Sequence, residues 1–134
     1  MDEKKKILIV DDNDLVRGTI KRVVQYLFNE FFSKNNFEIV EAVDGEKALE
    51  YFSGNNGSID ILLTDIRMPR MNGTTLLTKL HAEGYPLPKT IGIISGTVGD
   101  VGEINLPEEY YHFILPKPFL VEKLKDLFKK HYFK

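Results

Sequence analysis

The chain contains no cysteine. This absence excludes disulfide bonds, thiolate nucleophiles and cysteine-ligated zinc. The three histidines, His81, His112 and His131, do not show metal-ligand spacing either. We therefore expect any metal site to use oxygen ligands, and we expect the histidines to have surface or packing roles.

Long apolar runs are also missing. No run approaches the ~20 residues that a bilayer-spanning helix needs. The apolar stretch Ile7 to Val10 near the first methionine is too short for a secretory signal core. We expect a soluble, cytoplasmic protein with no membrane partner.

Charge of one sign does not dominate. The formal net charge is -2 and the isoelectric point is near 5.9, so no uniform basic field is available for nucleic acid. Hydrophobic residues make up 43% and charged residues 28% of the 134 residues, as in ordinary globular proteins. The charge therefore argues against direct nucleic-acid binding, and the length predicts one domain, residues 1–134.

Apolar runs and helical periodicities alternate along the chain. The pattern predicts strands at Lys6–Val10, Phe37–Ala42, Ile61–Thr64, Lys89–Ser95 and Tyr111–Lys117. It predicts helices from Leu15 to the break at Asn35-Asn36, with Asn13 or Asp14 as the N-cap, then at Glu46–Phe52, around Leu76–Leu80 and at Leu120–Phe128. This order predicts an α/β fold with parallel strands and helices on both faces of the sheet. Pro116 cannot donate a ladder hydrogen bond, so the last strand is predicted at a sheet edge.

The segment between the last two strands is a poor helix former. Gly96, Gly99 and Gly102 disfavour a helix by roughly 3 kcal/mol relative to alanine, and Pro107 stops its continuation. We therefore predict a short helix or a mobile loop over Thr97–Asn105.

Polar residues follow the apolar strands where these end. Asp11, Asp12, Asp65, Ser95 and Lys117 occupy such positions, and parallel strands bring their carboxyl ends to one edge of the sheet. Carboxylates that converge there repel one another, and a hard divalent cation such as Mg²⁺ neutralises them while keeping waters for phosphate oxygens. Asp65 as a nucleophile would form an aspartyl phosphate, with Lys117 pairing one phosphoryl oxygen and the Ser95 hydroxyl donating to another.

Four motifs occur in order along the chain: Ile7-Leu-Ile-Val-Asp-Asp-Asn13, Thr64-Asp-Ile-Arg-Met-Pro69 with Asn72-Gly73, Ile94-Ser-Gly96 and Leu115-Pro-Lys-Pro-Phe119. With these motifs the chain resembles a two-component response regulator receiver domain over essentially its whole length. The resemblance implies a doubly wound, five-stranded parallel sheet of order 2-1-3-4-5.

The same resemblance implies a signalling domain that is not an enzyme beyond its own phosphotransfer and autodephosphorylation. Asp65 would accept a phosphoryl group from a sensor histidine kinase or a histidine phosphotransfer protein, which would dock near Asn13–Gly18 and Phe119. Asp12, Asp65 and the Arg67 backbone carbonyl would bind Mg²⁺, and Asp11 would act through water. Gly96, after the switch hydroxyl, would leave the phosphoryl group accessible.

Three features depart from the family pattern. The first helix is longer than usual, and its last turns contain Phe28, Phe31 and Phe32, which we expect either to pack in the core or to extend an apolar docking surface. The aromatic switch position is Ile114, with Phe113 beside it on the other face of the strand. The glycine-rich fourth helix region is the third departure.

Several alternatives stay open on sequence grounds. Asp11 and Asp12 taken alone fit helix capping. An aspartate-nucleophile phosphatase would place a second acid where Arg67 stands, and a phosphorylation-independent interaction module of the same fold tends to lose the acids or the lysine. Tyr110, Tyr111 and Phe113 suit either the core or a partner surface. The output partner, and whether the domain works alone, in a relay or within a longer chain, are not determined.

Overall fold

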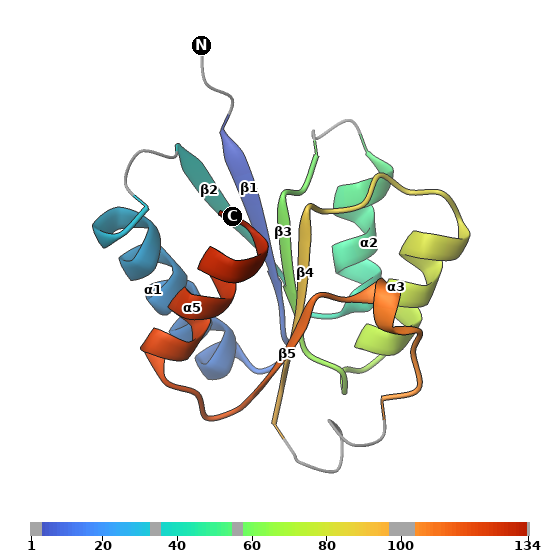
Figure 1. Cartoon of the computed structure of the whole chain (residues 1–134). Coiled ribbons are helices and arrows are strands. Elements are labelled where there is room, and N and C mark those ends of the chain that lie inside the picture. The colour runs from blue at the N-terminus through green and yellow to red at the C-terminus, as the bar shows by residue number, and fades with distance from the viewer. Residues whose placement is uncertain (1–3, 33–35, 55–57, 97–103, 134) are drawn as a thin grey trace.

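The computed structural model describes residues 4–32, 36–54, 58–96 and 104–133. Over these residues a central sheet lies between two layers of helices (Figure 1). The elements in chain order are β1 (Lys5–Val10), α1 (Asp14–Glu30), β2 (Phe37–Ala42), α2 (Gly45–Ser53), β3 (Ile61–Thr64), α3 (Gly73–Ala82), β4 (Thr90–Ser95), a 3₁₀ turn η1 (Glu108–Tyr110), β5 (Phe113–Pro116) and α5 (Val121–His131).

The sheet is parallel and its strand order is β2-β1-β3-β4-β5. This confirms the predicted fold class, strand order included, and it places Pro116 on an edge strand. Val10 pairs with Thr64 across β1 and β3, and Ser95 pairs with Pro116 across β4 and β5. The polar residues that follow these strands therefore meet at one edge of the sheet, where the strand order reverses between β1 and β3.

Side-chain caps start three of the helices. The side chains of Asn13, Asp44 and Asn72 accept hydrogen bonds from the backbone N–H groups of the third residue after each, and so cap α1, α2 and α3. Of the two candidates for the first cap, Asn13 takes that role. The N-cap of α5 is Leu120, whose side chain makes no capping hydrogen bond.

Each face of the sheet buries its own apolar cluster. Ile7 and Ile9 of β1 face α1 and α5, while Leu8 and Val10 of the same strand face α2 and α3. All four are at most 1% exposed, as expected of a central parallel strand that is covered on both sides. The continuous apolar run in the sequence reflects this double coverage.

The aromatic residues at the end of α1 divide between core and surface. Phe28 is fully buried and Phe32 is 8% exposed, and both pack against Phe128 and Phe133 near α5. Phe28 and Phe32 therefore pack in the core between α1 and α5. The expectation that they extend an apolar docking surface is wrong for these two residues. Phe31, beyond the last residue of α1, is 46% exposed, and Lys125 lies over its ring.

The last strand is shorter than the sequence indicates. Tyr111 and His112 precede β5, and Glu108–Tyr110 form a 3₁₀ turn that the pattern did not predict. Phe113 is buried on the α1 and α5 face, where its ring occupies the space that a Cβ on Gly92 would need. Ile114 lies on the other face, as expected, and packs against the apolar cluster there, as does the partly buried Tyr111. Tyr110 stacks on His81.

The prediction for Thr97–Asn105 falls mostly on residues 97–103, which lie outside the described residues. Ile104 and Asn105, at its end, are not helical. Among the helices that the structure describes, none is both long and apolar enough to cross a membrane.

Candidate functional site

Three carboxylates meet at the carboxyl edge of the sheet. Asp11 and Asp12 follow β1, Asp65 follows β3, and each contributes an oxygen to a group in which all lie within 4.8 Å of one another. Asp11 is buried, Asp65 is half-buried and Asp12 is exposed. We call these three residues the acidic cluster. Their convergence follows from the pairing of β1 with β3, as the sequence predicted.

Lys117, the residue after β5, reaches across the sheet edge to this cluster. Its Nζ lies 2.8 Å from Asp11 Oδ2 and 3.1 Å from Asp65 Oδ2. Burial lowers the pKa of Lys117, but the two carboxylates outweigh burial and raise it above its ordinary value. The lysine is therefore held in the charged form that can pair with an anionic group.

The opposing effects on the pKa of Asp65 give a different result. Burial raises the pKa of its carboxyl group above the ordinary value, and the opposing attraction of Lys117 and the hydrogen bond from the Ile66 N–H do not cancel that effect. The Ile66 N–H donates to Oδ1 at 2.7 Å, and Lys117 donates to Oδ2. The carboxylate is thus oriented through both oxygens and only partly solvated, which distinguishes it from a surface aspartate.

The other predicted residues lie on the same edge. Ser95 is the last residue of β4 and is fully buried, and its backbone carbonyl accepts a hydrogen bond from the Lys117 N–H at 2.7 Å. Among the described residues, no atom lies within 4 Å of the position that a Cβ on Gly96 would take. Arg67 is exposed in the β3–α3 loop, residues 65–72, two positions after Asp65.

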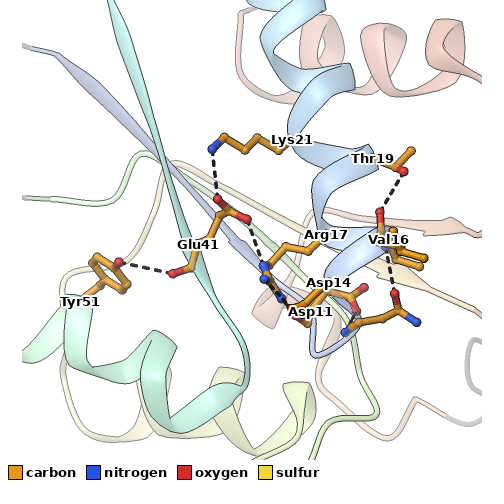
Figure 2. A network of polar contacts seen from close by, with 10 residues as sticks. Asp11, Asp14, Val16, Arg17, Thr19, Lys21, Glu41 and Tyr51 are labelled. Atoms are coloured by element: carbon orange, nitrogen blue, oxygen red, sulfur yellow. Dashed lines mark hydrogen bonds and ion pairs between the residues drawn. The ribbon is translucent and has the colours of Figure 1, made fainter.

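A polar network that the sequence analysis missed supports the β1 end of the site (Figure 2). Arg17 of α1 donates through Nη1 to the backbone carbonyl of Asp11 at 2.8 Å, through Nε to Glu41 at 3.0 Å and through Nη2 to Asp14 at 2.7 Å. Lys21 also pairs with Glu41, at 3.1 Å. The network links β1, α1 and β2 and holds the backbone of Asp11. Nothing in the local pattern identified it, since Glu41 lies 24 residues from Arg17.

The residues present suit a hard divalent cation. The donors are carboxylate oxygens from three residues, with no nitrogen or sulfur ligand among them, which is the donor set that Mg²⁺ prefers. Lys117 is a single cation beside three carboxylates, so the net charge of the acidic cluster remains negative. Asp12 and Asp65 remain accessible from solvent, whereas Asp11 is buried beneath them.

A hollow of about 410 Å³ lies on another part of the surface, between β2 and α2, but a larger one adjoins the acidic cluster. The larger hollow has a volume of about 530 Å³ and is lined mainly by apolar residues of α1 and of the segment after β5: Leu15, Val16, Thr19, Ile20, Val23, Gly96, Lys117, Pro118 and Phe119. We call it the α1 hollow. Lys117 lies both in its wall and against Asp65, so the hollow is continuous with the site.

Comparison with known proteins gives consistent matches. The sequence model described as the response regulator receiver domain matches residues 7–129. The chain is 34% identical over 124 residues to the sensor kinase CckA of Brucella abortus, covering 92% of this chain and 12% of the kinase. It is 29% identical to the response regulator MprA of a Mycobacterium species, and it spans 46% of that protein. The chain therefore corresponds to less than half the length of these relatives.

Two solved structures have the same architecture. The receiver domain of the hybrid histidine kinase CckA is 33% identical with a TM-score of 0.67, over 94% of this chain and 97% of that one. The response regulator TrrA from Thermotoga maritima, in complex with Mg²⁺-BeF, is 26% identical with a TM-score of 0.72, again over 94% and 97% of the two chains.

Proposed function

This chain belongs to the response regulator receiver family, whose members accept a phosphoryl group in two-component signalling, and from this premise we propose that Asp65 is the phosphoacceptor. The observation that carries the proposal is the position of Asp65. It is a half-buried carboxylate at the end of a central strand, it lies next to two further acids, and it pairs with a lysine from β5.

Magnesium fits the same residues. Receiver domains bind Mg²⁺, and we propose that Asp12, Asp65 and the Arg67 backbone carbonyl hold it in this chain, with Asp11 acting through water. When bound, the ion neutralises carboxylate and phosphoryl oxygens, so that one anion can approach another. The buried Asp11 is held from three sides by Lys117, Arg17 and the Asn13 N–H, which suits a supporting role.

The reacting groups have separate tasks. An Asp65 carboxylate oxygen attacks phosphorus, the bond from phosphorus to the donor breaks, and the donor leaves as imidazole from a phosphohistidine or as acetate from acetyl phosphate. Lys117 then exchanges its contact with the Asp65 carboxylate for a phosphoryl oxygen. Ser95 donates its hydroxyl to another phosphoryl oxygen, and Gly96, which has no side chain, leaves this group accessible.

We propose that the phosphodonor protein, a sensor histidine kinase or a histidine phosphotransfer protein, docks on the α1 hollow. Leu15 and Leu120 beside this region are 84% and 77% exposed, although both are apolar. The hollow leads to Lys117 and so to the acceptor. Leu15→Ala should slow phosphotransfer from a phosphorylated phosphotransfer protein and leave labelling by acetyl phosphate unchanged. We also propose that the protein is cytoplasmic and that it passes its signal on through protein–protein contacts.

The experiment that tests the acceptor is incubation with acetyl phosphate and Mg²⁺ followed by intact mass. Wild-type protein should gain one phosphoryl group. Asp65→Asn should gain none while keeping its fold, because the amide is nearly isosteric but not nucleophilic. Labelling of that variant at the wild-type rate would refute Asp65 as the acceptor. A wild-type protein that is never labelled would favour a phosphorylation-independent interaction module.

A further inference from the structure

The β3–α3 loop contains a backbone conformation that is unusual for its residue. Arg70 has a φ of 64°, the only positive φ at a non-glycine position among the described residues. The Met71 N–H donates to the Pro69 carbonyl at 2.7 Å, so the chain makes a tight three-residue turn centred on Arg70. Such a conformation costs on the order of 1–3 kcal/mol and persists only where surrounding contacts enforce it.

The enforcing contact is an ion pair with Asp44, which lies 26 positions earlier in the chain. Arg70 donates through Nε at 2.6 Å and through Nη2 at 2.5 Å to Asp44 Oδ2. The Asp44 side chain is fully buried, and its other oxygen accepts from the Lys47 N–H at 2.9 Å as the cap of α2. Loss of the charged partner of a buried carboxylate strongly destabilises the folded protein. The ion pair therefore holds Arg70 in place, although the arginine side chain is partly exposed.

Backbone contacts attach the same loop on both sides. The Gly45 N–H donates to the Met71 carbonyl at 2.9 Å, and a Cβ at Gly45 would lie only 2.6 Å from that oxygen. At the other end the Gly73 N–H donates to the Ile66 carbonyl at 2.7 Å. Arg67 thus lies between two anchored points, Ile66 and the turn at Arg70.

We propose that Arg70 and Asp44 are positioning residues for the metal site: their ion pair holds the β3–α3 loop, which carries Arg67, in one conformation before Mg²⁺ binds. The inference rests on the proposed function, because it takes the Arg67 carbonyl as a ligand. A preformed loop avoids the entropy cost of ordering this ligand on binding, and Mg²⁺ affinity rises accordingly. The strained turn is the cost of that arrangement.

The direction of the effect separates positioning from simple electrostatics. Arg70 is cationic, so removing its charge near an acidic site should strengthen Mg²⁺ binding if only Coulomb forces act. If the ion pair positions the loop, removing the arginine should weaken Mg²⁺ binding instead. The two accounts therefore predict changes of opposite sign in the dissociation constant.

The test is titration of the full, unphosphorylated chain with MgCl₂ by isothermal titration calorimetry. Arg70→Ala should raise the Mg²⁺ dissociation constant about tenfold, the lower end of what loss of an outer-shell partner costs. Arg70→Gly removes the same ion pair but adopts the positive φ without strain, so a weakened affinity in this variant cannot be ascribed to a distorted backbone. Arg70→Lys should restore part of the affinity, since it keeps the charge with fewer donors.

Lys79→Ala is the matched control. Lys79 is a half-exposed cation on α3 that pairs with Glu83 at 3.3 Å. Replacing it with alanine changes the net charge by the same amount as replacing Arg70. Its Mg²⁺ affinity should stay unchanged or rise slightly. Amide hydrogen exchange without metal should be faster over Arg67–Met71 in Arg70→Gly and unchanged in the control.

The outcomes are distinct. Wild-type binding of Mg²⁺ together with an unchanged or tighter dissociation constant in Arg70→Gly would overturn the positioning role and leave the proposed function intact. Failure of the wild-type protein to bind Mg²⁺ at millimolar concentration would overturn the metal site itself and the positioning role with it.

Discussion

The Lys117 ammonium lies 3.1 Å from the Asp65 carboxylate, although 52 residues separate them in the chain. It also lies 2.8 Å from Asp11, so one cation serves two acids of the acidic cluster. A cation that neutralises these acids in the absence of metal competes with Mg²⁺ for the same oxygens. The lysine and the ion therefore stabilise the site in alternative ways, and this relation can be measured.

Replacing Lys117 with methionine should destabilise the metal-free protein by about 2–3 kcal/mol, because the buried Asp11 loses its charged partner. Addition of Mg²⁺ should then raise the melting temperature more than it does in the wild type, since the ion replaces the missing cation. Thermal melts with EDTA and with MgCl₂ measure both effects. The control is Lys47→Met, whose lysine forms an exposed pair with Glu50 at 3.6 Å. Equal Mg²⁺ shifts in wild type and Lys117→Met would contradict this competition.

Arg17→Ala should lower the free energy of unfolding by about 2–3 kcal/mol, because the Asp11 carbonyl loses its arginine donor and Glu41 keeps only Lys21 as a charged partner. The Arg17 side chain is only 13% exposed, so water replaces these contacts poorly. Arg22→Ala, on the exposed face of the same helix, should cost under about 0.5 kcal/mol. Urea unfolding of the two variants compares them directly. Similar losses in both would mean that the network in Figure 2 contributes no more than helix propensity.

The aromatic residues of α1 should differ sharply in mutational cost. Phe28→Ala should lose about 3–5 kcal/mol, because Phe28 is fully buried among Phe32, Phe37, Phe128 and Phe133. Phe31→Ala should lose at most about 1 kcal/mol, since that ring is 46% exposed and contacts mainly Lys125 and Tyr26. Chemical denaturation measures both values. A larger loss for Phe31 than for Phe28 would reverse our assignment of core and surface.

Asp44 should make stability depend on pH at the acid end. Burial raises the pKa of Asp44, but the Lys47 N–H and the Arg70 guanidinium together lower it below the ordinary 3.8. The folded pKa is depressed, so the stability from the ionised group is present above 3.8 and is lost as pH falls through the folded value.

Asp44→Asn keeps a capping oxygen but does not titrate. The difference in unfolding free energy between wild type and Asp44→Asn should therefore shrink as pH falls from about 5 towards about 2. Urea unfolding across that range measures the difference. A gap that stays constant or widens at low pH would show that Asp44 gains nothing from being ionised in the folded state.

Much of the fold could be predicted because its local signals are strong. The apolar run of β1 was recognised from the sequence because helices cover this strand on both faces of the sheet. Asn13 was one of two candidates for the cap of α1, whereas the caps at Asp44 and Asn72 were not predicted. The sequence predicted the ends of strands less accurately where tertiary packing overrides the local hydrophobic pattern. Tyr111 has the composition of a strand residue, yet it precedes β5, because the 3₁₀ turn at Glu108–Tyr110 comes directly before it.

The sequence by itself determined the order of strands and helices and the polar residues at the strand ends, because parallel connections force those ends to one edge of the sheet. Only the tertiary structure decided which contacts hold those residues in place. The pairing of Arg70 with Asp44, of Arg17 with Glu41 and of Phe28 with Phe128 joins positions far apart in the chain. No local sequence pattern predicts these pairs, because they depend on how the helices and loops pack against the folded sheet.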